Sequence, residues 1–130
     1  MRKEQVARGP RGRVIVIDSI TQLDAADDGA IVVCGSHGGT SSAEFALQQP
    51  VRLVCFNDAG VGKDGAGIAA LALLQARGVA ALAVAHDSAR IGDALDAWQH
   101  GVVSHVNDLA CALGLRVGQP LGAALRNLLG

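Results

Sequence analysis

The chain has 130 residues, of which 50% are hydrophobic and only 2% aromatic, and its formal net charge is -1. This length suits one domain with a core of Ala, Val, Leu and Ile, and no stretch approaches the ~20 apolar residues of a membrane span or resembles a secretory signal. The body of the chain also lacks the basic stripe and stacking aromatics of a nucleic-acid groove, so we expect a cytoplasmic protein with neither a membrane nor a nucleic acid as partner.

The first thirteen residues contain the only local concentration of basic residues, with four Arg and one Lys. We interpret residues 1–12 as a solvated or partly ordered leader and residues 13–130 as a single α/β domain. The alternative is a basic arm that contacts a partner subunit or a polyanion.

Four continuous apolar runs predict strands that are covered on both faces. Short connections and helical segments alternate with them. This pattern predicts a three-layer α/β sandwich, Rossmann-like or flavodoxin-like, around a mainly parallel sheet of about four strands. The predicted strands are Arg13–Ile17, Ile31–Gly35, Val51–Phe56 and Val79–Ala85.

The segments between and after these runs predict helices. Gly101–His105 could add a fifth strand, and Ser104 is a plausible N-cap for the helix after it. The last helices are rich in Ala and Leu, which favours a homo-oligomer. The predicted helices are Ile20–Ala26, Ser41–Gln48, Gly65–Arg77, Ile91–Gln99, Ser104–Leu113 and Leu121–Leu129.

Each predicted strand ends in polar, chemically capable residues. Parallel strands share the edge at their C-terminal ends, and open α/β sheets bind ligands at that edge. We therefore expect one cleft that gathers these side chains with Lys63 and Arg90. The strand-end residues are Asp18-Ser19, Ser36-His37, Asn57-Asp58 and His86-Asp87-Ser88.

The glycine-rich segment 35–42 predicts an anion or oxyanion site. Backbone N–H groups of Gly38 and Gly39, beside a helix start, could hold a phosphate, a carboxylate or an oxyanion. We expect His37 to act on the substrate, and Ser36, Thr40 or Ser41 to bind it. The alternative is a tight turn with a hydroxyl N-cap.

The segment 57–65 contains the spacing G-x-G-x-x-G at Gly60, Gly62 and Gly65, with Asp87 at the end of the next strand. This is the dinucleotide fingerprint by spacing, and it supports the alternative of a nucleotide-binding or regulatory module. Charged neighbours weaken that interpretation. Lys63 could instead hold a substrate carboxylate, unless it is a solvated lysine paired with Asp64.

His86 is the strongest acid–base candidate, because imidazole titrates near neutral pH. Asp58 and Asp18 are its expected partners from other strand ends. Ser88 could bind substrate or, like Asp87, cap the next helix. Arg90 could capture a carboxylate or phosphate, or form an ion pair with Asp93.

Two further possibilities stay open. His37 and His86 with Asp58 or Asp87 would suffice for Zn²⁺ or Mn²⁺, although no H-x-H or HExxH spacing supports a metal. Cys34 could be a catalytic thiol, but all three cysteines fit a reduced core better. His105 has a surface role unless it reaches the cleft.

These patterns favour a small enzyme without an organic cofactor, acting on a small anionic, carboxylate-bearing metabolite. Hydrolysis fits best, with lyase or isomerase chemistry possible. A structural subunit is the remaining alternative. The expected catalytic residues are His37, His86, Asp58, Ser36 and Lys63, and the expected substrate-binding residues are Gly38, Gly39, Thr40, Asn57, Ser88 and Arg90.

Overall fold

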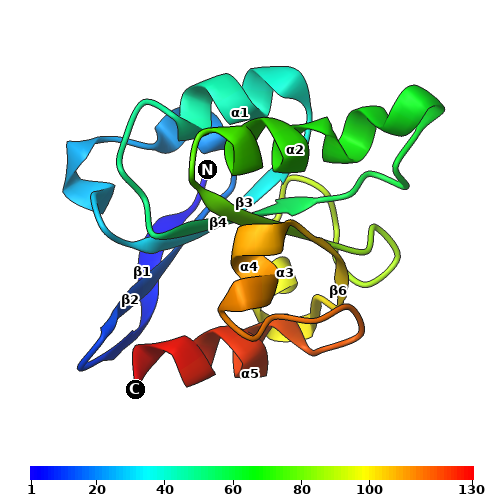
Figure 1. Ribbon diagram of the computed structural model, residues 1–130. Helices are drawn as coiled ribbons and strands as arrows, with labels where there is room; N and C mark the ends of the chain where they lie inside the picture. Colours follow the sequence, from blue (N-terminus) through cyan, green and yellow to red (C-terminus); the bar gives the residue numbers. More distant parts are fainter.

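The computed structural model describes residues 1–130, which fold around a six-stranded, mostly parallel sheet (Figure 1). The strand order follows the chain from one edge to the other, without the reversal that creates a switch point in doubly wound folds. Four strands were expected, and the two additional ones lie at the edges. The strands are β1 (Lys3–Gly9), β2 (Gly12–Ile17), β3 (Ile31–His37), β4 (Leu53–Asn57), β5 (Ala80–Val84) and β6 (Val103–Val106).

The four central strands, β2 to β5, run parallel, as their apolar sequences predicted. Both edge strands are antiparallel to their neighbours. Strand β1 lies within the segment 1–12, expected as a leader, and forms a hairpin with β2. Its charged residues are tolerated because an edge strand exposes much of its surface to water.

Strand β6 occupies part of the segment 104–113, for which a single helix was expected. The helix begins only at Asp108, because Asn107 rather than Ser104 caps it: the Asn107 side chain accepts the N–H of Ala110 at 2.9 Å. Asn107 is buried and also donates to the carbonyls of Leu71 and Val79. Its network of hydrogen bonds joins the end of β6 to neighbouring elements.

The helices are short, and 3₁₀ turns stand where longer helices were expected at 20–26 and 65–68. No helix combines the length and the apolar character that crossing a membrane requires. The α-helices are α1 (Thr40–Ala46), α2 (Ala69–Ala76), α3 (Ala94–His100), α4 (Asp108–Ala112) and α5 (Leu121–Arg126), and the 3₁₀ helices are η1 (Ile20–Gln22), η2 (Ala25–Asp27), η3 (Lys63–Ile68) and η4 (Asn127–Leu129).

Alternate residues of the central strands enter two separate hydrophobic clusters. Ile15 and Val32, for example, pack with residues of α1 and α2, whereas Val14 and Ile31 pack with residues of α3, α4 and α5. Figure 1 shows α1 and α2 above the sheet and α3, α4 and α5 below it. With both faces covered, polar side chains of the central strands are confined to the strand ends.

Candidate functional site

The C-terminal ends of the parallel strands place the predicted polar residues along one edge. His37 at the end of β3 pairs in register with Asn57 of β4. The N–H of Asp58, the next residue, donates to the carbonyl of Val84 on β5 at 2.9 Å. His86 follows β5 by two residues. The predicted parallel direction of these strands is confirmed, since β4 lies parallel to β3 and β5.

Asp58 lies at the centre of this edge, and its carboxylate faces two imidazoles. Asp58 is only 4% exposed. Its Oδ1 accepts the N–H groups of Gly60 at 2.8 Å and of His86 at 3.0 Å. The same oxygen lies 3.4 Å from Nδ1 of His86, while Oδ2 lies 3.9 Å from Nδ1 of His105. One buried carboxylate thus lies within ion-pair distance of two rings, and the Ser104 hydroxyl also contacts Nδ1 of His105 at 3.0 Å.

The surroundings of Asp58 favour its charged form. Burial alone would raise the pKa of this carboxyl, but the hydrogen bonds from Gly60, Ser104 and the His86 backbone, with the charge of His86, outweigh burial. The pKa of Asp58 therefore falls below its ordinary value of 3.8. At neutral pH the residue is a buried anion in contact with the half-exposed His86.

His105 joins this group from β6, which overlaps the possible fifth strand at 101–105. The sequence interpretation gave His105 a surface role unless it reached the cleft, because it favoured a helix that starts at Ser104. A signal was present in the chain: Val102, Val103 and Val106 surround Ser104-His105 with β-branched residues. Asp58, His86 and His105 are referred to below as the Asp58 cluster.

The loop that follows Asp58 has an unusual backbone. Ala59, Val61 and Asp64 have φ angles of +52°, +69° and +56°, in the left-handed region that side chains disfavour. Asn57 Oδ1 accepts the N–H of Ala59, and the carbonyl of Val61 accepts that of Gly67 at 2.6 Å. Strained residues cluster at functional sites more often than elsewhere, so the loop supports a role for this edge.

His37 lies outside the Asp58 cluster. Its Nδ1 accepts the N–H of Gly39 at 3.0 Å. A backbone N–H can only donate, so the neutral ring carries its proton on Nε2 and is a hydrogen-bond donor there. The ring borders a small pocket of about 190 Å³ with Ala59, Val61 and Gly62, which neither Asp58 nor His86 lines.

His37 also borders the largest pocket, of about 480 Å³, which lies beyond β2 and β3. Ser36 and Ser41 contribute hydroxyls, but the Ser36 oxygen already accepts the N–H of Ile20 at 3.0 Å. Asp18 also lines this pocket. Its carboxylate accepts the N–H groups of Arg2 and Ala94, so it anchors β1 and α3 and does not pair with His86.

The glycine N–H groups that were expected to bind an oxyanion already have partners. Gly38 donates to the carbonyls of Asn57 and Gly67, and Gly39 donates to His37. Thr40 is the exposed first residue of α1. This turn is therefore internally hydrogen-bonded and offers no free donor at Gly38 or Gly39.

Asn57 and Ser88 also have structural partners. The buried Asn57 amide donates to the carbonyl of Ala89 at 3.0 Å. The Ser88 hydroxyl donates to Ala85 and accepts the N–H of Val102. Both side chains therefore stabilise the loops at this edge of the sheet through hydrogen bonds to the backbone.

Lys63 and Arg90 are exposed, and neither has a carboxylate within ion-pair distance. Lys63 thus does not pair with Asp64. Arg90 lies close enough to Asp96 for its charge to help lower the pKa of that carboxyl, behind the larger effects of hydrogen bonds from the Arg90 backbone and His100. Neither Lys63 nor Arg90 lines the pockets described above.

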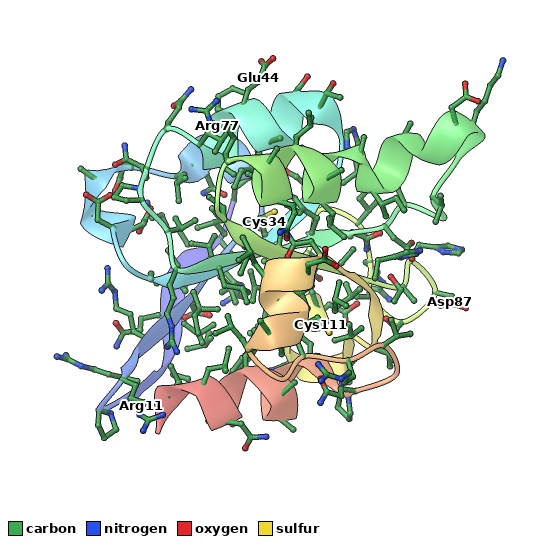
Figure 2. The ribbon with its side chains drawn as sticks, in the orientation of Figure 1. Arg11, Cys34, Glu44, Arg77, Asp87 and Cys111 are labelled. Atoms are coloured by element: carbon green, nitrogen blue, oxygen red, sulfur yellow. The ribbon has the colours of Figure 1, made fainter.

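Cys34 does not have the setting of a nucleophile. Its side chain is buried in the sheet interior (Figure 2), and burial raises the pKa of its thiol to about 12. The thiol is therefore protonated at neutral pH and unreactive. No three His, Cys, Asp or Glu side chains are grouped so that they could hold a metal ion.

The glycines of the G-x-G-x-x-G spacing do not lead directly into a helix. Gly60, Gly62 and Gly65 all have positive φ, and α2 begins only at Ala69. In the dinucleotide fingerprint the helix N-terminus itself meets the pyrophosphate. The loop thus departs from the geometry that the spacing suggested.

Comparisons with known proteins assign no family to this arrangement. No family model matches the chain, and no curated protein or solved structure matches it either.

Proposed function

We propose that the protein is a small enzyme, independent of an organic cofactor, that performs acid–base chemistry on a small carboxylate-bearing metabolite. The observation that carries this proposal is the Asp58 cluster: a 4%-exposed carboxylate in contact with His86 at 3.4 Å. A buried anion that orients an accessible imidazole is a recurrent arrangement for proton transfer.

In this proposal His86 is the general base and Asp58 its positioning residue. Asp58 faces Nδ1, so it favours the tautomer with the proton on that nitrogen and leaves a lone pair on Nε2. The side chain of His86 is 59% exposed, which gives a substrate access to Nε2. When the ring gains a proton, the adjacent carboxylate stabilises the resulting charge.

Hydrolysis is the simplest reaction that this pair supports. Nε2 of His86 removes a proton from water, the hydroxide adds to an acyl carbon, and protonated His86 returns the proton to the departing amine or alkoxide. His105 places a second imidazole at the same carboxylate. Lyase or isomerase chemistry would use the same proton transfers at a carbon acid.

The exposed Lys63 supplies the proposed anion recognition. It lies in η3, in the loop that follows Asp58, and no carboxylate neutralises it. The substrate would place its carboxylate against Lys63 and its reacting carbon against His86. The proposal also includes a homo-oligomer and the three-layer sandwich expected from the sequence, with a sequential strand order in place of the reversed order of Rossmann-like folds.

The test is hydrolysis of a panel of amides and esters of short dicarboxylic acids, followed by ¹H NMR. We expect His86→Gln and Asp58→Asn to lower kcat/KM at least ~100-fold, the lower limit typical for a lost acid–base group. His100→Gln is the matched control, since His100 also contacts a carboxylate, Asp96, but at the exposed end of α3. Equal turnover by wild type and His86→Gln, or none on any panel member, contradicts the hydrolase assignment.

A further inference from the structure

Two arginines face each other on the β1–β2 hairpin, at the opposite edge of the sheet from the Asp58 cluster. Arg8 and Arg13 are directly opposed in the antiparallel register. Like charges in this position destabilise a strand pair. Neither side chain has a carboxylate within ion-pair distance, so no ion pair offsets the repulsion.

These arginines border a pocket of about 470 Å³, nearly as large as the one beside His37. Its lining contains no acidic residue. Arg13 is fixed, because its Nη2 donates to the carbonyls of Ala26 at 2.7 Å and Asp28 at 3.3 Å. Arg8 is exposed and makes no side-chain hydrogen bond. The lining residues are Gln5, Arg8, Gly9, Pro10, Gly12, Arg13 and Ala26.

The hairpin turn is held in place by the C-terminal end of the chain. The N–H of Arg11 donates to the carbonyl of Leu129 at 3.0 Å. The guanidinium of Arg52, at Nη1, donates to the carbonyls of Arg11 at 3.1 Å and Leu128 at 3.0 Å. Arg52 thus brings a further positive charge close to the turn, in addition to Arg8, Arg11 and Arg13. The pocket is preformed, and a ligand need not order the hairpin.

We propose that this pocket, the hairpin pocket, binds the phosphate groups of a small phosphorylated compound. Guanidinium groups bind phosphate oxygens in pairs of parallel hydrogen bonds, and a phosphate between Arg8 and Arg13 would relieve their repulsion. The volume lies within the ~300–1,000 Å³ of small-molecule sites. No aromatic residue lines the pocket, which argues against single-stranded nucleic acid, where bases stack on aromatic rings.

The hairpin pocket is separate from the proposed catalytic site. Figure 2 shows Arg11, at the hairpin turn, and Asp87, next to His86, on opposite sides of the molecule. The strand directions agree, since Arg13 lies near the start of β2 and Asp58 follows the end of β4. Phosphate binding here is therefore independent of whether the proposed chemistry is correct.

The test is isothermal titration calorimetry of the full chain with pyrophosphate. We expect saturable binding at one site, weakened at least ~10-fold in Arg8→Gln, because a bidentate charged contact contributes 1.4 kcal/mol or more. Arg8→Gln should fold normally, since the exposed side chain makes no contact that holds the fold. Arg77→Gln, which changes an exposed arginine outside the pocket, should bind within about two-fold of wild type.

Two further measurements identify the ligand class and the binding site. Lys63→Gln should retain full pyrophosphate affinity, which separates the hairpin pocket from the proposed substrate site. A single-stranded oligonucleotide should bind more weakly than pyrophosphate at equal ionic strength. Unchanged affinity in Arg8→Gln, absence of pyrophosphate binding, loss of binding in Lys63→Gln, or tighter binding of the oligonucleotide would each overturn the proposal.

Discussion

Asp58 holds His86 at two points: its Oδ1 accepts the backbone N–H of His86 at 3.0 Å and lies 3.4 Å from Nδ1 of the ring. The first contact fixes where the chain leaves β5, and the second places the imidazole beside the carboxylate. Because Asp58 is buried and His86 is exposed, the pair combines a rigid anion with an accessible proton acceptor.

Replacing Asp58 with Asn should change how stability depends on pH. The folded pKa of Asp58 lies below its ordinary value of 3.8, so the ionised carboxylate stabilises the fold above that pH. The contribution is lost as the pH falls through the folded pKa. We expect Asp58→Asn to lower the free energy of unfolding at pH 7 by about 1–3 kcal/mol, and the difference from wild type to shrink below pH 3.8.

Urea unfolding from pH 7 to pH 2.5 measures this difference. Asp87→Asn is the control, because Asp87 is exposed, projects from the molecule in Figure 2 and makes no ion pair. It should change stability by less than about 0.5 kcal/mol. A constant difference between wild type and Asp58→Asn across the whole pH range would show that the carboxylate is not stabilised in the fold.

The same substitution should have opposite effects at Ala59 and Ala72. Both alanines are exposed, but Ala59 has φ +52° and Ala72 lies within α2. Glycine at Ala59 would relieve a left-handed backbone strain of ~1–2 kcal/mol, but the greater entropy of the unfolded chain would cost ~0.5–1 kcal/mol of this gain. We expect Ala59→Gly to stabilise by about 0.5–1 kcal/mol and Ala72→Gly to destabilise by about 1 kcal/mol. Thermal and urea unfolding measure both variants. If both substitutions change the free energy of unfolding in the same direction, Ala59 is not strained.

The central sheet could be predicted because continuous apolar runs leave few alternatives to buried parallel strands. The edge strands were harder to predict. Lys3–Gly9 has no regular apolar alternation, and β1 carries a register shift between Gln5 and Ala7 and is largely exposed. Strand β6 was expected only as a possible fifth strand at 101–105, because the residue type of Ser104 suits a helix N-cap as well as a strand.

The candidate site was predictable in part for the same reason. Strand ends identified Asp58 and His86, because parallel strands share an edge whatever the connecting loops do. Which side chains then meet depends on the path of residues 58–68. That path passes through left-handed conformations at Ala59, Val61 and Asp64, where their residue types predict right-handed or extended backbone. His105 was missed because its position depends on β6.

Gly67→Ala should displace the loop that follows Asp58. A Cβ atom at Gly67 would lie 2.0 Å from the backbone oxygen of Asp58, which cannot rotate away. Gly67 is buried, so the loop must shift as a whole. We expect a loss of about 2–3 kcal/mol in the free energy of unfolding, at the upper end for an overpacked site.

Gly78→Ala is the matched control for Gly67→Ala. Gly78 has φ +80° but open space around its Cβ position, so it tests backbone conformation without the collision. Gly78→Ala should lower the free energy of unfolding by about 1 kcal/mol. If Gly67→Ala is no more destabilised than Gly78→Ala in urea unfolding, the close approach of Gly67 to Asp58 does not constrain the loop.

Lys3 should stabilise the protein through the buried Asp27. Its ammonium lies 2.9 Å from Asp27 Oδ2 and donates to the carbonyl of Gln22 at 2.8 Å. Burial lowers the pKa of Lys3, but hydrogen bonds to Asp27 and Asp24 outweigh it and raise the pKa above 10.5. Lys3→Met leaves a 3%-exposed carboxylate without its cation, so we expect a loss of about 2–3 kcal/mol.

Arg2→Gln is the control for Lys3→Met, since it breaks a pair with Glu4 whose side chains are 46% and 45% exposed. Such exposed pairs contribute ~0–1 kcal/mol, so the free energy of unfolding should hardly change. The Lys3 contribution should be fully present below pH 10.5 and should decline as the pH rises through the folded pKa. Urea unfolding at pH 7 and above pH 10.5 measures both effects, and equal stabilities of Lys3→Met and Arg2→Gln at pH 7 would show that β1 does not depend on this ion pair.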